Sequence, residues 1–340
     1  MRERLLELIA CPACGSAFTC DPTESEGGRV VSGTLRCVGC GSGYPVVRGI
    51  PRLVEGALEE AEHRTAEAFG WEWQEFHELH GEEEYRQQFL DWVHPIEPDF
   101  FTDKVVLDAG CGMGRFAVQS ALFGARDVLA IDLSDAVEAA AENARGHPNV
   151  HVIQGDIHRL PLARGLDAVV DFAYSIGVLH HLPEPVRGFL SIAEHLREGG
   201  SLFAWVYGRE NNGWLVHFVN PVRESVSSRL PKRALYVISW LIAAAMHLPL
   251  KLLYRERGLG RVGLVKRILP YRGYLGWLAQ YSLHHNHHVV FDHLVAPTSH
   301  YIPRDEFESW FHRAGLRDVE LSWRNENSWR GRGRLVRDPT

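Results

Sequence analysis

Three aspartates and a glycine-rich turn are the residues of this sequence whose types and spacing best suit ligand binding. Asp108 stands in the run VVLDAGCGMGRF, just before three alternating glycines, Gly110, Gly112 and Gly114. Glycine permits positive φ and lets a ligand approach the backbone closely. Asp132 closes a second apolar run, where a carboxylate can accept both hydroxyls of a ribose, and Asp156 closes a third, where it can accept from an adenine amino group. The GxGxG spacing differs from the GxGxxG of dinucleotide-binding turns, so the pattern describes a nucleoside without a pyrophosphate.

Four of the six cysteines form a second set with defined chemistry. They stand as two C-x-x-C pairs separated by 22 residues: Cys11, Cys14, Cys37 and Cys40. This spacing is typical of a zinc ribbon, in which four thiolates hold one tetrahedral ion. Four protein ligands leave no open position, so we expect Zn²⁺ with a structural role. Two reduced pairs without metal, or a redox pair, are the alternative.

Histidines provide the candidates for a general base. His180 and His181 follow the predicted fourth strand in YSIGVLHH, and His300 lies beside Tyr301 further along the chain. A histidine suits this role because its pKa is close to the working pH. For His180 and His181 the alternative is a histidine that hydrogen-bonds to the backbone beside the cofactor, and His300 with Tyr301 is a secondary candidate as base or orienter. Six histidines crowd residues 284–300, but neighbours on a strand point to opposite faces, so we expect a substrate pocket there rather than a second metal site.

From Lys104 onward the sequence alternates between strand and helix patterns, and the predicted strands and helices would position the aspartates and the glycine turn. KVVLDAG, VLAIDLS, VHVIQGD and SLFAWVY are typical of buried strands, and the amphipathic segments between them of helices. The alternation predicts an open, doubly wound α/β sheet. In such a sheet, ligands bind beyond the carboxyl ends of the strands, where the three aspartates would lie.

The motifs VLDAGCGMGRF, AIDLS, GDIHRLPL and YSIGVLHHLPEP occur in this order across roughly residues 100–207. In them the chain resembles the class I S-adenosylmethionine-dependent methyltransferases, most closely the group that includes the ubiquinone and menaquinone biosynthesis enzymes. The resemblance implies a mostly parallel, Rossmann-like seven-stranded sheet, S-adenosyl-L-methionine as cofactor and methyl transfer as the activity. It also implies cofactor contacts. By this resemblance, Asp108 and Gly110 to Gly114 would contact the methionine portion of the cofactor. Asp132 with Leu133 would contact the ribose, and Asp156 with Ile157 the adenine.

The first 50 residues resemble the short zinc-ribbon activator subunit of tRNA and translation-factor methyltransferases. LLELIACPACGSAF and LRCVGCGSGYPVVRGIPRLV carry this likeness, which covers the ribbon only and implies nothing about partners. The predicted organisation is then a zinc ribbon (1–54), an acidic helical linker (55–99), a cofactor-binding core (100–208), a helical insert (209–289) and the final strands and helix of the sheet (290–340).

Charge is distributed unevenly around a net −7. The linker carries 14 Asp/Glu and 2 Arg, a net −12, and we expect its aromatic residues to pack on the core rather than to bind ligand. Residues 229–272 carry ten Lys/Arg and one Glu, a net +9, around the uncharged run 234–250. That run borders on transmembrane length, but one crossing would separate VVFDHLV (or a neighbouring segment) and VELSWR, the expected last strands, from their sheet. An interfacial helix on an anionic membrane, a lid over a lipophilic acceptor, or a buried or oligomeric contact remain open.

These observations favour an enzyme that methylates a small-molecule or lipid-like acceptor by direct displacement. An RNA methyltransferase is the alternative, with the ribbon and insert binding nucleic acid, but the acidic total argues against it. The N/D-P-P-Y/F motif of amino-methylating nucleic-acid enzymes is also absent after the fourth strand. A non-catalytic binding protein is a third alternative. Because the apolar stretch in MRERLLELIAC is short and contains Glu7, it does not fit an export signal, and we expect a cytoplasmic, possibly membrane-associated, protein.

Overall fold

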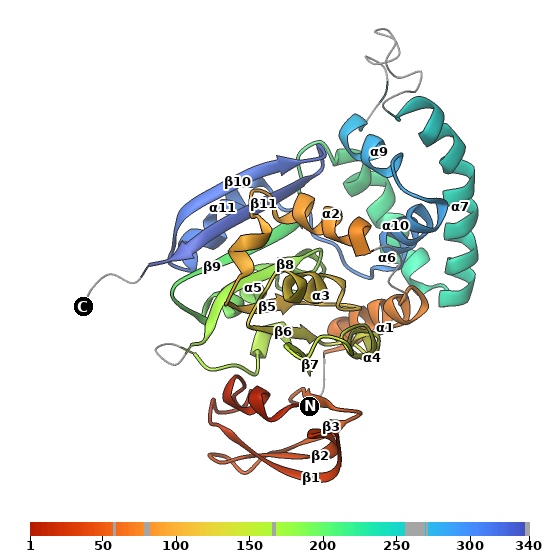
Figure 1. Ribbon diagram of the computed structural model, residues 1–340. Coiled ribbons are helices and arrows are strands. Elements are labelled where there is room, and N and C mark those ends of the chain that lie inside the picture. Colours follow the sequence, from red (N-terminus) through yellow and green to blue (C-terminus); the bar gives the residue numbers. More distant parts are fainter. Residues whose placement is uncertain (57–58, 78–81, 165–167, 256–268, 270, 337–340) are drawn as a thin grey trace.

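The computed structural model describes residues 1–56, 59–77, 82–164, 168–255, 269 and 271–336. Three parts are stacked along the molecule in Figure 1: a small β-ribbon at the bottom, a central α/β core, and a helical insert along one side. The cofactor-binding core thus lies between the two parts that carry the cysteines and the long apolar helix.

Seven strands form the central sheet, as predicted, in the order β7-β6-β5-β8-β9-β11-β10. Its first five strands are parallel, and β11 is antiparallel to both of its neighbours. The bounds are β5 Val105–Ala109, β6 Asp127–Asp132, β7 Val150–Gly155, β8 Val170–Ile176, β9 Leu196–Tyr207, β10 Leu316–Arg324 and β11 Ser328–Leu335. Every residue of β5 and β8 is buried, as expected for parallel strands covered on both faces.

Helices cover both faces of this sheet. One face packs against α5 (Pro185–Ala193) and α11 (Arg304–Arg313). The other packs against α2 (Glu82–Val93), α3 (Arg115–Leu122) and α4 (Ala136–Asn143), with α1 (Glu60–Glu75) beside α4. Helices on both faces leave the carboxyl ends of the strands as the open edge for a ligand.

The cysteine ribbon joins the central sheet directly. It contains β1 (Phe18–Glu26), β2 (Arg29–Cys37), β3 (Gly43–Val47) and β4 (Ile50–Leu53), and β4 pairs in parallel with β7. Arg48 and Arg52 also pair with Glu138 of α4. The ribbon therefore extends the sheet to eleven strands and is fixed to the core by hydrogen bonds and ion pairs.

The insert is helical and contains α6 (Asn220–Ser225), α7 (Lys232–Leu253), α9 (Arg272–Leu278) and α10 (Leu283–Val295). The prediction that VVFDHLV forms a strand is wrong, because this segment is the second half of α10. Its buried residues His287, Phe291 and Val295 recur every four positions and belong to a helical face packed on α7. The last two strands are β10 and β11, a hairpin after α11, and α10 crosses the predicted insert boundary at residue 289.

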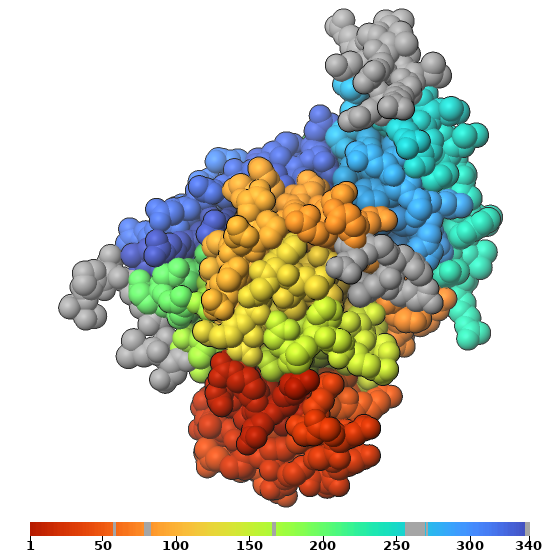
Figure 2. Space-filling model, viewed as in Figure 1, coloured from red at the N-terminus to blue at the C-terminus, as the bar shows by residue number. Residues whose placement is uncertain are grey.

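The apolar run lies within α7, which packs along α10 at the rim of the molecule (Figure 1). Among the described residues, α7 is the one helix whose length and composition would suffice to cross a membrane. Its buried residues Leu235, Ser239, Ala243 and Leu250 form one face toward the protein. The opposite face is uncovered in Figure 2. Four basic residues of the predicted +9 segment, Arg257, Arg261, Lys266 and Arg267, lie outside the described residues.

Candidate active site

The glycine turn between β5 and α3 needs glycine for both backbone conformation and space. Gly110, Gly112 and Gly114 have φ values of +86°, +52° and +78°. A Cβ on Gly112 would lie 2.9 Å from the indole of Trp73, and one on Gly110 would collide with Val178. The backbone of the turn thus packs directly against Val178 and Trp73 and leaves no room for a side chain at either glycine.

Asp132 holds this turn against the end of β6. Its Oδ2 accepts from the backbone N–H of Gly112 at 2.9 Å, and its Oδ1 accepts from the N–H and the hydroxyl of Ser134 at 2.9 and 2.7 Å. Burial raises the pKa of Asp132, and the Ser134 hydrogen bonds oppose that shift. One carboxylate therefore links the glycine turn, the second strand and the loop that leads to α4.

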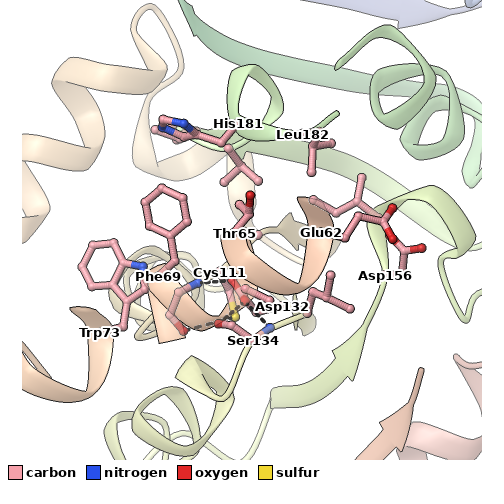
Figure 3. A pocket seen from close by; sticks show the side chains of 18 of the residues that line it. Glu62, Thr65, Phe69, Trp73, Cys111, Asp132, Ser134, Asp156, His181 and Leu182 are labelled. Carbon is pink, nitrogen blue, oxygen red and sulfur yellow. Dashed lines mark hydrogen bonds between the residues drawn. The ribbon is translucent and has the colours of Figure 1, made fainter. Parts of the chain in front are cut away.

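A cavity with about 960 Å³ of empty space, its open mouth included, lies at these strand ends and is called the cofactor cavity after the ligand predicted for it. Seven of the predicted site residues line it: Gly110, Gly112, Asp132, Leu133, Asp156, Ile157 and His181. Figure 3 shows residues of α1 facing Asp132 and Asp156 across the cavity. The structure thus brings most of the predicted cofactor ligands to one wall.

Four predicted residues are not part of that wall: Asp108, Gly114, His180 and His300. Asp108 lies beneath the glycine turn, 3% exposed, hydrogen-bonded to the Tyr174 hydroxyl and the Ala117 N–H. Burial, together with the charge of Asp132, raises the pKa of Asp108 to about 8. In this position Asp108 supports the turn from below instead of facing the cavity.

A small polar cluster occupies the end of the cavity predicted for the adenine. Asp156 accepts from the N–H of His158 at 2.8 Å, and the His158 ring lies 3.6 Å from Glu62 of α1. Burial opposes ionisation of both groups, but their mutual contact lowers the pKa of Asp156 and raises that of His158. Asp156 is therefore held as a carboxylate, the form that accepts from an amino group.

The acidic linker contributes more than the predicted packing. Trp71 does pack on Phe291 of α10, with ring centroids 5.3 Å apart, and Phe89 stacks on Phe116 at 5.0 Å. However, Glu62, Thr65, Phe69 and Trp73 of α1 line the cofactor cavity. The aromatic residues of this segment were the available signal, but sequence alone does not show which helical face meets the strand ends.

The candidate histidines adopt different environments. His181 lines the cavity, and its Nδ1 lies 2.8 Å from the Thr298 carbonyl, so Nδ1 carries the proton and Nε2 keeps a lone pair. Burial lowers the pKa of His181 to about 3, so the ring is neutral. His180 is fully buried, with no hydrogen-bond partner for its ring among the described residues, and its carbonyl accepts from the N–H of His300. His181 is the one of the three that can face a ligand.

A second chamber adjoins the cofactor cavity, with about 730 Å³ of empty space. The two share Trp73, Arg115, Ile176, Gly177 and Asp292. The second chamber continues between α2, β9, α9 and α10 and is walled by tryptophans, tyrosines and the histidines of α10. The histidine-rich segment was thus correctly predicted to border a pocket, although it does so from a helix.

Buried acids lie at the boundary between the two chambers. Asp292 of α10 borders both and receives a hydrogen bond from the Tyr207 hydroxyl at 3.3 Å. Burial and the nearby Glu72 raise the pKa of Asp292 to about 7. Glu72 itself is fully buried, 3.1 Å from Nε2 of His288. A carboxyl that titrates near neutrality beside a cofactor cavity fits a general base, and sequence reasoning missed it.

The four cysteines of the ribbon converge, with all their sulfur atoms within 4.8 Å of one another. Sγ of Cys11 lies 3.7 Å from Cys40, and Sγ of Cys14 lies 3.4 Å from Cys37. A tetrahedral zinc with Zn–S bonds of about 2.3 Å requires sulfurs about 3.8 Å apart. The arrangement therefore fits Zn²⁺, which would join the two C-x-x-C turns; Cys20 lies outside the cluster.

Comparison with known proteins supports the prediction of a methyltransferase domain in the centre of the chain. Residues 107–204 match the family model described as "Methyltransferase domain". The matched stretch runs from within β5 to within β9 and carries the glycine turn and the three aspartates. The cysteine ribbon precedes this methyltransferase domain, and the helical insert follows it.

The chain is also similar to tRNA U34 carboxymethyltransferases. One from Shewanella loihica is 31% identical over 42% of this chain and 48% of the relative. One from Shewanella sp. strain W3-18-1 is 29% identical over 48% of this chain and 55% of the relative. The chain thus spans about half the length of the curated relatives it matches.

Solved structures resemble the methyltransferase more loosely. A SAM-dependent methyltransferase from Aquifex aeolicus is 15% identical, with 76% of this chain and 100% of that chain covered and a TM-score of 0.40. An O-methyltransferase family protein from Burkholderia thailandensis is 14% identical, with 74% and 56% covered and a TM-score of 0.41.

Proposed function

We propose that this chain is an S-adenosylmethionine-dependent methyltransferase that methylates a small molecule held in the second chamber. The observation that carries the proposal is the pairing of two adjoining cavities. One is lined by the glycine turn, Asp132 and Asp156, and the other by aromatic residues and the acids of α10. A bound cofactor would supply a sulfonium methyl group for in-line displacement, in which catalysis is mainly positioning.

The residues of the chain would fix the cofactor at three points. Oδ2 of Asp132 accepts one hydrogen bond from the turn and keeps a lone pair for a ribose hydroxyl, and Asp156 accepts from the adenine amino group. Gly110 and Gly112 line the cavity, so the methionine portion can approach their backbone there. Trp73 of α1 contacts the turn, lines both chambers and lies against His288 of α10, with ring centroids 4.9 Å apart.

Proton removal from a hydroxyl acceptor would fall to a group at the boundary. Asp292 and Nε2 of His181 are the candidates, because both line the cofactor cavity and each keeps a free lone pair. His180 and His300 would act as positioning residues, since the His180 carbonyl accepts from the His300 N–H and so fixes the loop before α11.

An RNA acceptor is the second candidate function, favoured by the names of the tRNA-modifying relatives. One experiment distinguishes the small-molecule acceptor from the RNA acceptor. The purified protein is incubated with methyl-labelled cofactor and a cell extract, which is then separated into small-molecule, lipid and RNA fractions. Label in a small-molecule or lipid fraction supports the proposal, and label in RNA supports the alternative. Cofactor binding without label in any fraction would indicate a non-catalytic protein and contradict both.

A membrane-surface role for the insert belongs to this proposal as well. Val237, Leu241, Leu248 and Leu252 are 56%, 56%, 64% and 52% exposed on the outer face of α7. Lys232, Arg233 and Lys251 lie near the two ends of that helix. Apolar side chains with basic flanks match an anionic bilayer surface, on which α7 would lie parallel to the membrane. The helix would then bring the second chamber close to the lipid surface.

A further inference from the structure

Among the described residues, the half-buried guanidinium of Arg115 at the boundary between the chambers has no carboxylate partner. Arg115 begins α3 directly after the glycine turn and lines both the cofactor cavity and the second chamber. Its guanidinium carbon lies 4.7, 5.1 and 5.8 Å from the ring centroids of Phe116, Trp73 and Trp92. Within the described part of the chain it forms no ion pair with a carboxylate. Aromatic faces attract the cation but supply no hydrogen-bond acceptor.

The other arginine of the second chamber is compensated. Arg324 hydrogen-bonds and pairs with Asp91, and its guanidinium lies 5.3 Å from the ring centroids of both Trp92 and Trp277. Both arginines thus have aromatic neighbours, but only Arg324 has a carboxylate as well. The contrast indicates that the donors of Arg115 are left for a ligand.

The acids near Arg115 do not replace such a ligand. Glu72 and Asp292 influence its charge from beyond ion-pair distance. Burial raises the pKa of Glu72 and, together with Glu72, raises that of Asp292 to about 7, which weakens both acids as anionic partners. A half-buried guanidinium keeps donors available for a ligand, and a planar carboxylate that accepts two parallel N–H bonds is the group that a guanidinium recognises best.

The rest of the chamber indicates what would carry that carboxylate. Its walls include Trp205, Tyr207 and Tyr274, which suit a planar ring. Three buried polar atoms along them, Oε1 of Gln88, Nε1 of Trp92 and Oδ1 of Asn327, have no hydrogen-bond partner among the described residues. Unpaired buried polar atoms are unfavourable unless a ligand or water satisfies them, so a ring with polar substituents fits better than a hydrocarbon.

We propose that the second chamber binds an aromatic acceptor that bears a carboxylate, and that Arg115 binds this carboxylate. The inference rests on the proposed function, because it assigns the substrate class of the same site. Arg115 would then select the acceptor by its charge, at the boundary between the cofactor cavity and the second chamber.

Calorimetry on the full chain saturated with S-adenosylhomocysteine tests this assignment with two matched probes. 4-Hydroxybenzoate and 4-hydroxybenzamide have nearly the same shape and differ in charge. The wild type should bind the acid at least about tenfold more tightly than the amide. Equal binding, or no binding of the acid, would overturn the inference without the need for a variant.

Arg115→Met should remove the preference for the acid, whereas Arg86→Met should retain it. Arg86 is the matched control, because it lies 5.7 Å from the ring centroid of Phe123, outside both chambers. Each variant is also titrated with S-adenosylhomocysteine and with methylthioadenosine, which lacks the amino-acid carboxylate. If Arg115→Met weakens the binding of S-adenosylhomocysteine tenfold but leaves that of methylthioadenosine unchanged, Arg115 binds the cofactor carboxylate and the inference is wrong.

The failure of the proposed function gives a different result. In that case S-adenosylhomocysteine itself does not bind to the wild type. Cofactor binding without discrimination between acid and amide would overturn only the assignment of the acceptor.

Discussion

Asp132 couples the cofactor site to pH through its own burial. Its pKa is raised by burial, and the ionised form is the one that accepts a hydrogen bond from the ribose. Affinity for S-adenosylhomocysteine should therefore be full above this raised pKa and fall as the pH is lowered through it. Asp132→Asn should bind roughly tenfold more weakly at neutral pH and show a flatter profile. Calorimetry at several pH values measures both, and an unchanged affinity of the variant would refute the ribose assignment.

Asp108 should instead affect stability. Its pKa is about 8 in the folded protein and about 3.9 in an unfolded chain, so the native state holds an extra proton between these values. The stability contributed by this group is full below pH 4 and is lost as the pH rises toward 8, by at most about 1.4 kcal/mol per unit. Asp108→Asn should remove that slope and gain stability relative to the wild type at pH 8, with little difference at acidic pH.

Urea unfolding at pH 5 and pH 8 measures this difference. The exposed Asp99→Asn provides the control, because it should leave the pH dependence unchanged. If Asp108→Asn shows the same slope as the wild type, Asp108 is ionised in the folded protein and the account of its burial is wrong.

The chemistry of the strand ends was more predictable than that of the helices facing them. Asp132 and Asp156 follow apolar strands, and parallel strands place such residues at one edge whatever the rest of the chain does. Arg115, Trp73 and Asp292 enter the site through tertiary packing of α1, α3 and α10. No local pattern shows which side of an amphipathic helix will meet a cavity.

At the scale of elements, the uncovered face of α7 makes the most specific prediction. The wild type should float with vesicles that contain anionic lipid, more weakly at high salt, and bind poorly to neutral vesicles. Leu241→Asp with Leu248→Asp should reduce the bound fraction about tenfold. Val38→Asp, at a ribbon residue that is 62% exposed, should not.

An oligomeric role of the same face would give another pattern. The wild type would then form a dimer or larger species in sedimentation experiments, and the double variant would be monomeric. Vesicle binding that is unaffected by the double variant would contradict the membrane assignment.

The histidine-rich segment shows why one element was mispredicted. LHHNHHVVFDHLV contains β-branched and aromatic residues that suit a strand, but its buried positions follow a helical period once α7 is present to pack against. Histidine is neutral to both structures, so the choice depends on a partner that is distant in sequence.

At the scale of the whole molecule, the folding of the ribbon should depend on bound metal. The stability of the core should depend on the ribbon only through the edge at which the two pair. We expect about one zinc per chain, lost in Cys14→Ser and retained in the control Cys20→Ser. Because β4 pairs with β7, loss of zinc should also lower the melting temperature of the core. Metal analysis and thermal unfolding test this; a full zinc content in Cys14→Ser would contradict the four-cysteine site.

The net charge of −7 conceals the division of the chain into parts with different surroundings. The acidic linker forms a wall of the cofactor cavity through α1, and the basic insert presents its apolar helix to the exterior. The order of these parts could be predicted from the sequence. The direct pairing of ribbon and core could not, because nothing in the residues of four short strands indicates which strand outside the ribbon will pair with them.

Thermal unfolding with S-adenosylhomocysteine tests the central claim most directly. At a ligand concentration 100 times its Kd, the wild type should gain about 2.7 kcal/mol and a rise of several degrees in Tm, whereas NAD should cause none. Asp132→Ala should lose most of that rise. A Tm unchanged by S-adenosylhomocysteine, or raised equally by NAD, would contradict the assignment of the cavity to a methyl-donor nucleoside.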